Sequence, residues 1–217
     1  MAANPMVYKW LSALMCYPEQ ELLDALPEFQ TALDQWPELA PKREELQTLL
    51  DHLGSQSLRQ LQEDYVLVFD RTRQHALYIF EHVYGEDRDR GSAMVDLLEE
   101  YRRHGFELGD EELPDYLPAL LEFFAHIPAP EAEKLLGDAV HVIHHIGKNL
   151  AAYGSPYAAL LQTAVSLSPV EPQPLTEPPV RDMDEAMETF GSDVQGIEPL
   201  LKPSVQTVQF YPNGRPA

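Results

Sequence analysis

The chain has 217 residues, of which 44% are apolar, with a formal charge of -21 and a pI near 4.5. This charge disfavours nucleic acid and anionic lipid surfaces as partners and favours basic ones, such as a positively charged peptide. The single cysteine, Cys16, excludes an intramolecular disulfide and a cysteine-based zinc or iron–sulfur centre.

Apolar residues recur at helical spacing through the first third of the chain. They predict a helix over residues 6–16 and a second helix with a kink at Pro27. A third helix begins near Pro41, and we expect Gly54 to end it in the left-handed conformation. Ser57 is placed to cap a fourth helix that continues to about residue 69.

Residues 64–91 have the most unusual pattern, because charge brackets an aromatic segment. We expect one helix of about a dozen residues that ends at Gly85, with a core stripe that includes Ile79 and a second, polar and aromatic face. Charges from Asp70 to Arg73 precede it, and the run EDRDRG follows it. Such a surface could hold an amphipathic peptide in a groove while carboxylates meet its basic residues, although solvated loops have similar charge runs.

Four further helices are expected after this stretch. One closes before Gly105, and one over residues 113–127 has Asp115 as its cap. There Asp115, Ala119 and Glu122 share a face, either an ordinary exposed face or an acidic wall of the groove. The longest helix covers residues 131–153 and ends at Gly154, and a last helix runs to about residue 167.

No strand pattern of any length occurs in residues 1–167, so we expect a single-domain, all-α bundle of about eight or nine helices. Residues 168–217 form a Pro-rich acidic tail that is expected to be extended or disordered, with a short helix over 183–189. The chain start lacks a basic leader, and no stretch approaches the roughly 20 apolar residues that cross a bilayer, so a cytoplasmic protein is expected.

The cluster His141, His144 and His145 is the most metal-like group in the sequence. It permits a metal-dependent helical enzyme, yet helical spacing places it with Lys148 on the face opposite the apolar stripe, as in an ordinary solvent-facing surface. No glycine-rich phosphate loop is present, and no activating pattern surrounds Cys16. We therefore predict no catalytic residue, no resident metal and no cofactor.

Two motifs carry a family resemblance: FDRTRQHALYIFEHVYGEDRDRGSAMVDLLEEYRRHGFEL and LPDYLPALLEFFA. The chain resembles the nitrate reductase molybdenum cofactor assembly chaperones, the delta-subunit (NarJ) family of the TorD-like group, over residues 6–167. The resemblance implies an all-helical cytoplasmic chaperone that binds the N-terminal segment of the nitrate reductase catalytic (α) subunit. It further implies that the apoenzyme stays open for cofactor insertion and that membrane docking is delayed. A nucleotide-responsive regulator is a weaker alternative, because that cofactor contains a guanine nucleotide and no motif here binds one.

The resemblance places functional positions in both motifs. Phe69, Phe80 and Leu117 are expected in the core, and Tyr116 stands where the wider group has a histidine. Gly85 and Gly91 are expected to fix loop geometry. We expect peptide contacts from polar and aromatic residues of these motifs: Tyr65, Asp70, Arg71, His75, Tyr78, Glu81, His82, Tyr84, Asp89, Arg90, Asp115, Tyr116 and Glu122.

Overall fold

We analysed a computed structural model of the chain, which describes residues 4–84, 89–109 and 112–175. These residues lie within one compact unit, Met1–Pro179. Gly85, residues 86–88 of the run EDRDRG and the elements predicted beyond residue 175 lie outside the described residues. Residues 89–91 of that run begin the helix α7 (Asp89–Arg103), so the expectation that Gly91 fixes a loop is wrong. No helix in the described part of the chain is long and apolar enough to span a membrane.

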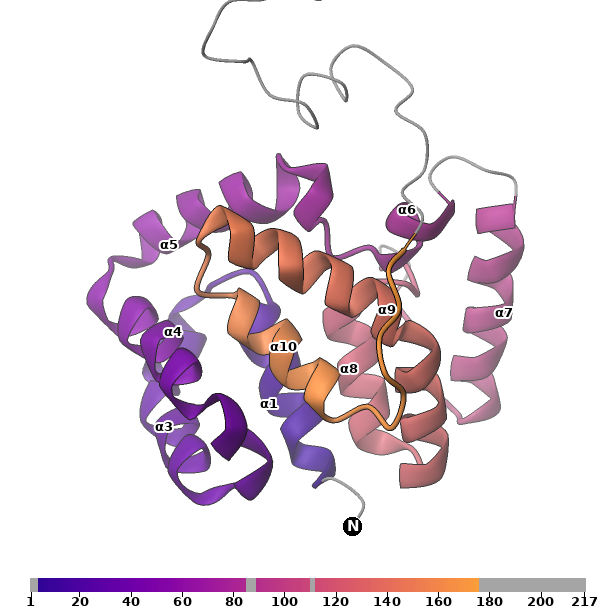
Figure 1. The fold of residues 1–217 in the computed structure, drawn as a ribbon, viewed down its shortest axis with the longest axis horizontal. Coiled ribbons are helices and arrows are strands. Elements are labelled where there is room, and N and C mark those ends of the chain that lie inside the picture. The colour runs from indigo at the N-terminus through magenta and orange to yellow at the C-terminus, as the bar shows by residue number, and fades with distance from the viewer. Residues whose placement is uncertain (1–3, 85–88, 110–111, 176–217) are drawn as a thin grey trace, which may run out of the picture. The chain divides into compact units, whose positions relative to one another are not determined.

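The described residues contain ten α-helices and no strand, which confirms the all-α prediction with slightly more helices than expected (Figure 1). The α-helices are α1 (Pro5–Met15), α2 (Gln20–Asp24), α3 (Leu26–Gln35), α4 (Arg43–Ser55), α5 (Leu58–Tyr65), α6 (Ile79–Tyr84), α7 (Asp89–Arg103), α8 (Leu117–His126), α9 (Ala129–Tyr153) and α10 (Ala158–Ser166). Three shorter turns complete the list: 3-10 helices at Pro37–Lys42 and Arg73–His75, and a π-helical turn at Val66–Asp70.

The core forms where α1 packs on α8 and α10 packs on α9. Apolar residues at helical spacing line these contacts, as in the edge-to-face pair of Tyr8 and Phe124, whose ring centroids are 5.8 Å apart. The buried Ser12 hydroxyl donates to the Pro118 carbonyl over 2.7 Å. Proline at the second position of α8 does not break the helix, because its missing N–H has no intrahelical partner there.

Several predicted helix boundaries are confirmed and two are wrong. Ser57 accepts the Gln60 N–H over 3.3 Å as the N-cap of α5, and Gly154 ends α9 with φ of 82°. Gly54 does not stop α4 in the left-handed conformation, because it lies inside that helix without a positive φ. In place of a kink at Pro27, the chain breaks at Ala25 into α2 and α3, with Pro27 in the first turn of α3.

The single helix expected before Gly85 is also wrong. Its first half is a 3-10 turn followed by extended backbone, and α6 begins only at Ile79. The reason is a long-range pairing: the Ile79 N–H donates to the Asp115 carbonyl over 3.1 Å, and the Leu117 N–H donates to the Leu77 carbonyl over 2.8 Å. These bonds satisfy backbone groups that a helix would otherwise satisfy internally.

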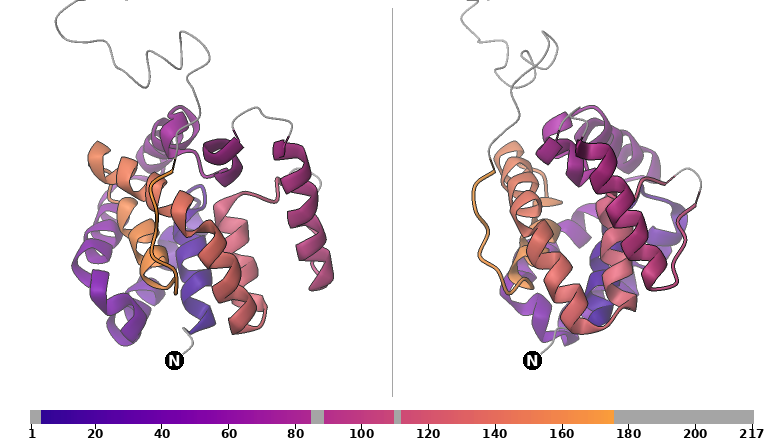
Figure 2. Two further views of the ribbon diagram at one scale, coloured as in Figure 1. Left: turned by 45° about the vertical axis from the view of Figure 1, so that its right-hand side comes forward. Right: turned by 90° about the vertical axis from the view of Figure 1, so that its right-hand side faces the viewer.

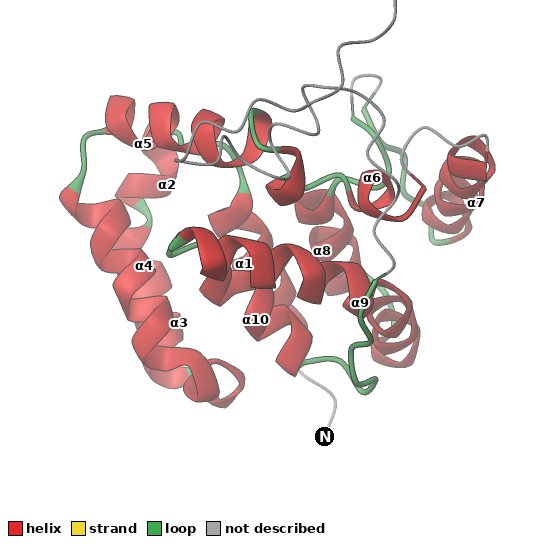
Figure 3. Cartoon of the chain, turned by 45° about the horizontal axis from the view of Figure 1, so that its top comes forward, coloured by secondary structure: helices red, strands yellow, loops and turns green. Residues whose placement is uncertain are grey.

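Helix α7 stands apart from the rest of the bundle and is joined to it mainly at its ends (Figure 2). Tyr101 is the one fully buried residue of α7, and its hydroxyl donates to the Pro114 carbonyl over 3.2 Å. Val95 of α7 is apolar, yet it is 53% exposed. Helix α6 lies between α7 and α9 (Figure 3).

Residues 168–175 run extended beside α9 (Figure 1). The Gln173 N–H donates to Nδ1 of His141 over 2.9 Å. Val170 packs so closely on Gly137 that a Cβ at this glycine would lie 2.9 Å from its Cγ2 atom. Glycine at position 137 therefore makes room for the segment.

Candidate functional site

The two motifs singled out in the sequence meet at one short backbone pairing. Tyr78 and Tyr116 form an isolated antiparallel bridge, and their ring centroids are 5.3 Å apart. The bridge brings the segment before α6 against the start of α8. Residues about 35 positions apart in the sequence thus share one site, as the backbone bonds of Ile79 and Leu117 require.

Beside the Tyr78 and Tyr116 pairing lies a group of ion pairs that joins the half-buried Glu81 and Arg90 to the buried Asp115, and we call it the Arg90 bridge. Asp115 is fully buried, and its Oδ2 accepts the Phe80 N–H over 3.0 Å. The Arg90 guanidinium lies 3.9 Å from Asp115 and 3.4 Å from Glu81. Oδ1 of Asp115 has no hydrogen-bond partner within the described residues. The site therefore holds a buried acid with unused capacity to accept a hydrogen bond.

The ionisation of Asp115 reflects this position. Burial raises the pKa of its carboxyl, while the Phe80 N–H and the Arg90 charge oppose the rise. Desolvation therefore outweighs the ion pair, because one partly exposed guanidinium at 3.9 Å only partly replaces the lost water.

An apolar cleft of about 270 Å³ opens between α6, α7, α8 and α9. Phe80, whose N–H reaches Asp115, is part of its wall, so the cleft adjoins the Arg90 bridge. Asp138 is the one charged residue in the lining. The cleft is lined by Ile79, Phe80, Val83, Tyr84, Leu97, Leu120, Phe124, Leu135, Asp138, Ala139 and Val142.

Three further tyrosines lie in a series of contacts with Tyr116. We call the four residues, Tyr17, Tyr65, Tyr78 and Tyr116, the tyrosine cluster. The hydroxyls of Tyr65 and Tyr116 lie 3.3 Å apart, and Tyr65 also donates to the Met15 carbonyl over 2.8 Å. The rings of Tyr17 and Tyr65 pack edge to face. Tyr17 is 44% exposed and Tyr78 is 36% exposed, so the cluster offers aromatic surface at both ends.

Negative charge surrounds the tyrosine cluster. Burial raises the pKa of Tyr116 to about 12, and the charge of Asp70 adds to the rise. Burial also raises the pKa of Tyr78, with further contributions from Asp115, Asp70, Glu81 and Glu112. The carboxylates of Asp70, Glu81 and Glu112 contribute a negative potential here that favours a bound cation, so this face suits a basic ligand.

The predicted contact residues divide into exposed and buried sets. Asp70, Arg71 and Asp89 are exposed, and Glu81, Tyr84, Arg90 and Tyr116 are half-buried. Tyr65, His75, His82 and Asp115 are buried. The residues of this last set contact other parts of the chain and offer no open surface to a ligand.

Both buried histidines bond to backbone carbonyls. His75 Nδ1 lies 3.2 Å from the Val68 carbonyl oxygen, and His82 Nε2 lies 2.8 Å from that of Ala76. Burial lowers the pKa of His82 to about 4. The nearby His145 and Arg73 lower this pKa further, and the hydrogen bond to Ala76 opposes the shift. His82 is therefore neutral at pH 7 and shapes the turn before α6.

The predicted acidic wall of Asp115, Ala119 and Glu122 does not form. Asp115 is fully buried and accepts from Phe80, and Tyr116, not Asp115, is the N-cap residue of α8. Glu122 is exposed and pairs with Lys9 of α1 over 3.6 Å. It is not among the residues that line the cleft.

The histidines of α9 do not converge on a common point. His145 packs on His82 with ring centroids 5.8 Å apart, and Asn149 Nδ2 lies 3.1 Å from its Nε2. His144 is exposed, while His141 accepts from Gln173. The polar face of α9 is thus partly covered by residues 73–82 and not fully solvent-facing, because the 3-10 turn and α6 pack on it.

Cys16 has no activating partner in the described part of the chain. Its thiol donates to the Ser12 carbonyl over 3.4 Å. Burial raises its pKa to about 11, with added contributions from Glu122, Glu112 and Glu19. The thiol stays protonated at neutral pH, which is the opposite of a nucleophile's requirement.

Two features of the structure were not predicted from the sequence. The α9 wall of the cleft, such as Leu135 and Val142, resembled ordinary core at helical spacing. A cluster of Glu100, His104 and Glu131 was also missed. The spacing of Glu100 and His104 by four residues could have signalled a pair on one helix face.

The comparisons with known proteins agree with the motifs. Residues 36–162 match the family model described as nitrate reductase delta subunit. The nitrate reductase molybdenum cofactor assembly chaperone NarJ of Escherichia coli (strain K12) is 38% identical over 160 residues, covering 73% of this chain and 67% of that protein. A Bacillus subtilis (strain 168) protein is named probable nitrate reductase molybdenum cofactor assembly chaperone NarJ. It is 31% identical over 158 residues, covering 72% of this chain and 84% of that protein.

A solved structure shares the fold. A candidate redox enzyme maturation protein from Archaeoglobus fulgidus superposes with a TM-score of 0.54 at 20% identity, covering 76% of this chain and 93% of that one. The names of these sequence relatives describe assembly chaperones and not catalysts. Because the family model spans more than half of the chain and the resemblance in the two motifs is confirmed, the chain belongs to the nitrate reductase delta subunit family.

Proposed function

We propose that this protein is a cytoplasmic assembly chaperone for nitrate reductase. It binds the N-terminal segment of the catalytic (α) subunit and keeps the apoenzyme competent for molybdenum cofactor insertion before membrane docking. The family and the names of its relatives support the chaperone role. The chain itself performs no bond chemistry in this proposal, and its work is reversible binding.

The apolar cleft beside the buried Asp115 carries the proposal. A groove of this kind can take one face of an amphipathic segment, with apolar side chains inserted between α6, α8 and α9. A basic residue of the segment can meet the exposed Asp138 carboxylate in the cleft lining.

The tyrosine cluster is proposed as the second contact surface. Tyr78 and Tyr17 offer exposed aromatic faces, and the acids around them attract a cation. Arginine or lysine over such a ring gains roughly 0.5–2 kcal/mol. Of the predicted contact residues, nine have the exposure to touch the segment: Asp70, Arg71, Tyr78, Glu81, Tyr84, Asp89, Arg90, Tyr116 and Glu122.

The buried members of the predicted set are proposed as positioning residues. His75 and His82 fix the turn before α6, and Tyr65 orients Tyr116 through the contact of their hydroxyls. Residues 1–167 are proposed to be sufficient for binding.

Calorimetric titration tests the proposal. The full chain is titrated with a synthetic peptide of the first few dozen residues of the partner nitrate reductase catalytic subunit, and in parallel with a scrambled peptide of equal composition. The proposal expects saturable heat for the native peptide at micromolar concentration and none for the scrambled one. Equal heats for both peptides would reduce the interaction to non-specific charge attraction and overturn the proposal.

A further inference from the structure

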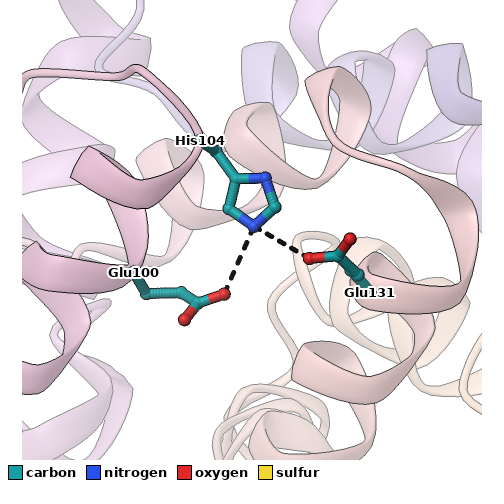
Figure 4. A group of neighbouring side chains, drawn as sticks. All are labelled: Glu100, His104 and Glu131. Carbon is teal, nitrogen blue, oxygen red and sulfur yellow. Dashed lines mark ion pairs between the residues drawn. The ribbon is translucent and has the colours of Figure 1, made fainter.

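We infer that Glu100, His104 and Glu131 form a binding site for a divalent transition-metal ion of the zinc type, at the junction of α7 and α9. The three side chains point toward one another from the C-terminal end of α7 and the first turn of α9 (Figure 4). This site is separate from the cleft, whose lining includes none of the three.

The distances suit a first coordination shell. His104 Nε2 lies 3.0 Å from Oε2 of Glu131 and 3.4 Å from Oε1 of Glu100. One ligand atom from each residue lies within 4.8 Å of the other two. Zinc–ligand bonds of about 2.1 Å in a tetrahedron place neighbouring ligand atoms about 3.4 Å apart. Small side-chain rotations of the glutamates would bring the third pair to that separation.

Nε2 of His104 has no hydrogen-bond partner in the described residues and contacts only the two glutamate carboxylates as ion pairs. This nitrogen is buried. A proton on Nε2 would therefore point at neither oxygen in good geometry. A buried nitrogen without a hydrogen bond needs an explanation. An ion placed between the three atoms would supply one, because this nitrogen would then be a ligand.

The backbone holds the ligands in place. Gly105, with φ of 82°, ends α7 in a Schellman motif in which the Phe106 N–H donates to the Tyr101 carbonyl and the Gly105 N–H to that of Arg102. The His104 ring packs edge to face on Phe123, with centroids 5.5 Å apart. The ring is therefore oriented before any ion binds, as a metal site requires.

Arg103 is the natural competitor for the ion. Its guanidinium contacts Glu100 and lies 3.6 Å from Glu131. The Arg103 side chain is 64% exposed, so it can swing into water when an ion replaces its charge. If the three residues form only an ion-pair network, removal of Arg103 should lower the stability of the fold. If they form a metal site, its removal should raise the affinity for the ion.

The donor set selects the class of ion. One imidazole nitrogen and two carboxylates suit zinc, cobalt or nickel, while magnesium and calcium prefer oxygen ligands throughout. Three protein ligands leave a fourth position for water or for a donor from a partner.

Zinc titration of the untagged full chain tests the inference. Calorimetry with zinc chloride is expected to give one ion per chain, and cobalt is expected to give visible absorption bands of a low-symmetry site. Glu131→Gln and His104→Gln are each expected to weaken zinc affinity at least about tenfold. Magnesium in excess is expected not to compete.

Two further variants separate this site from adventitious binding. His144→Gln removes an exposed histidine of α9 and is expected to leave affinity unchanged. Arg103→Ala is expected to tighten binding, because it removes the competing cation. Loss of zinc binding in His144→Gln, equal affinity of wild type and Glu131→Gln, or absence of stoichiometric binding would overturn the inference. Glu131 is half-exposed, so its variant reports on the site even if His104→Gln fails to fold.

Discussion

The Arg90 guanidinium lies 3.9 Å from the fully buried carboxylate of Asp115, and this contact fastens the first turn of α7 to the start of α8. Burial nevertheless raises the pKa of Asp115. The folded protein therefore binds this proton more tightly than the unfolded chain does. It follows that the free energy of unfolding decreases as pH rises through the interval from the unfolded to the folded pKa.

Asp115→Asn removes the buried charge and keeps an oxygen that can accept the Phe80 N–H. We expect stability at pH 7 to be unchanged or higher by up to about 1 kcal/mol, with a shallower pH dependence above pH 4. Urea unfolding at several pH values measures both, with Glu63→Gln as the exposed matched control. A loss of several kcal/mol at pH 7 would mean that the Arg90 pairing outweighs the cost of burial.

His82 makes acid a destabilising condition. Burial lowers its pKa to about 4, below the value near 6.5 of an unfolded histidine. The unfolded chain therefore binds the extra proton first, and the free energy of unfolding falls as pH drops from about 6.5 toward 4. Between pH 7 and pH 5 this residue alone costs about 2 kcal/mol.

His82→Gln should remove most of that loss, since glutamine can still donate to the Ala76 carbonyl but does not titrate. Urea unfolding of wild type and variant at pH 7 and pH 5 gives the difference. His144→Gln, at an exposed position of the same helix bundle, should keep the wild-type pH dependence. Parallel pH curves for wild type and His82→Gln would contradict the account.

Two glycines that the sequence presents alike differ in the structure. Gly154 has φ of 82°, so Gly154→Ala places a Cβ in the left-handed region and should cost about 1–2 kcal/mol. Gly54 lies inside α4 with its nearest neighbour atom 3.7 Å from a built Cβ, so Gly54→Ala should be neutral or stabilise by up to about 1 kcal/mol. Chemical denaturation of both variants checks this, and equal losses would contradict the assigned backbone conformations.

The sequence predicted the helices well wherever one face meets the core. The stripes of α4, α8 and α9 follow from apolar spacing alone, and the stop at Gly154 follows from the glycine after the last apolar residues. The turn before α6 could not be predicted in this way. It depends on backbone bonds to Asp115 and Leu117, and local periodicity contains no information about partners that far along the chain.

The site was predicted by residue type more than by geometry. Both motifs do meet, at the Tyr78 and Tyr116 bridge. Asp115 was taken as exposed because it is charged, yet it is buried, and Arg90 and the Phe80 N–H compensate its charge from other elements. The α9 wall of the cleft looked like core because an apolar groove and a core have the same composition.

The central claim is that the catalytic-subunit segment binds in the cleft. Two exposed valines provide a matched pair for testing it. Val83 is 43% exposed and lines the cleft, while Val95 is 53% exposed on α7 and is not among the lining residues. The same change to aspartate should therefore affect binding at one position only.

The most direct measurement is the calorimetric affinity of the native N-terminal peptide for wild type, Val83→Asp and Val95→Asp. Since both valines are exposed, each variant should keep its thermal midpoint within a few degrees. We expect Val83→Asp to weaken binding about tenfold or more, because one apolar contact with the peptide is lost. Val95→Asp should bind like wild type. Equal affinity of all three proteins, or a loss confined to Val95→Asp, would place the peptide elsewhere and contradict the account.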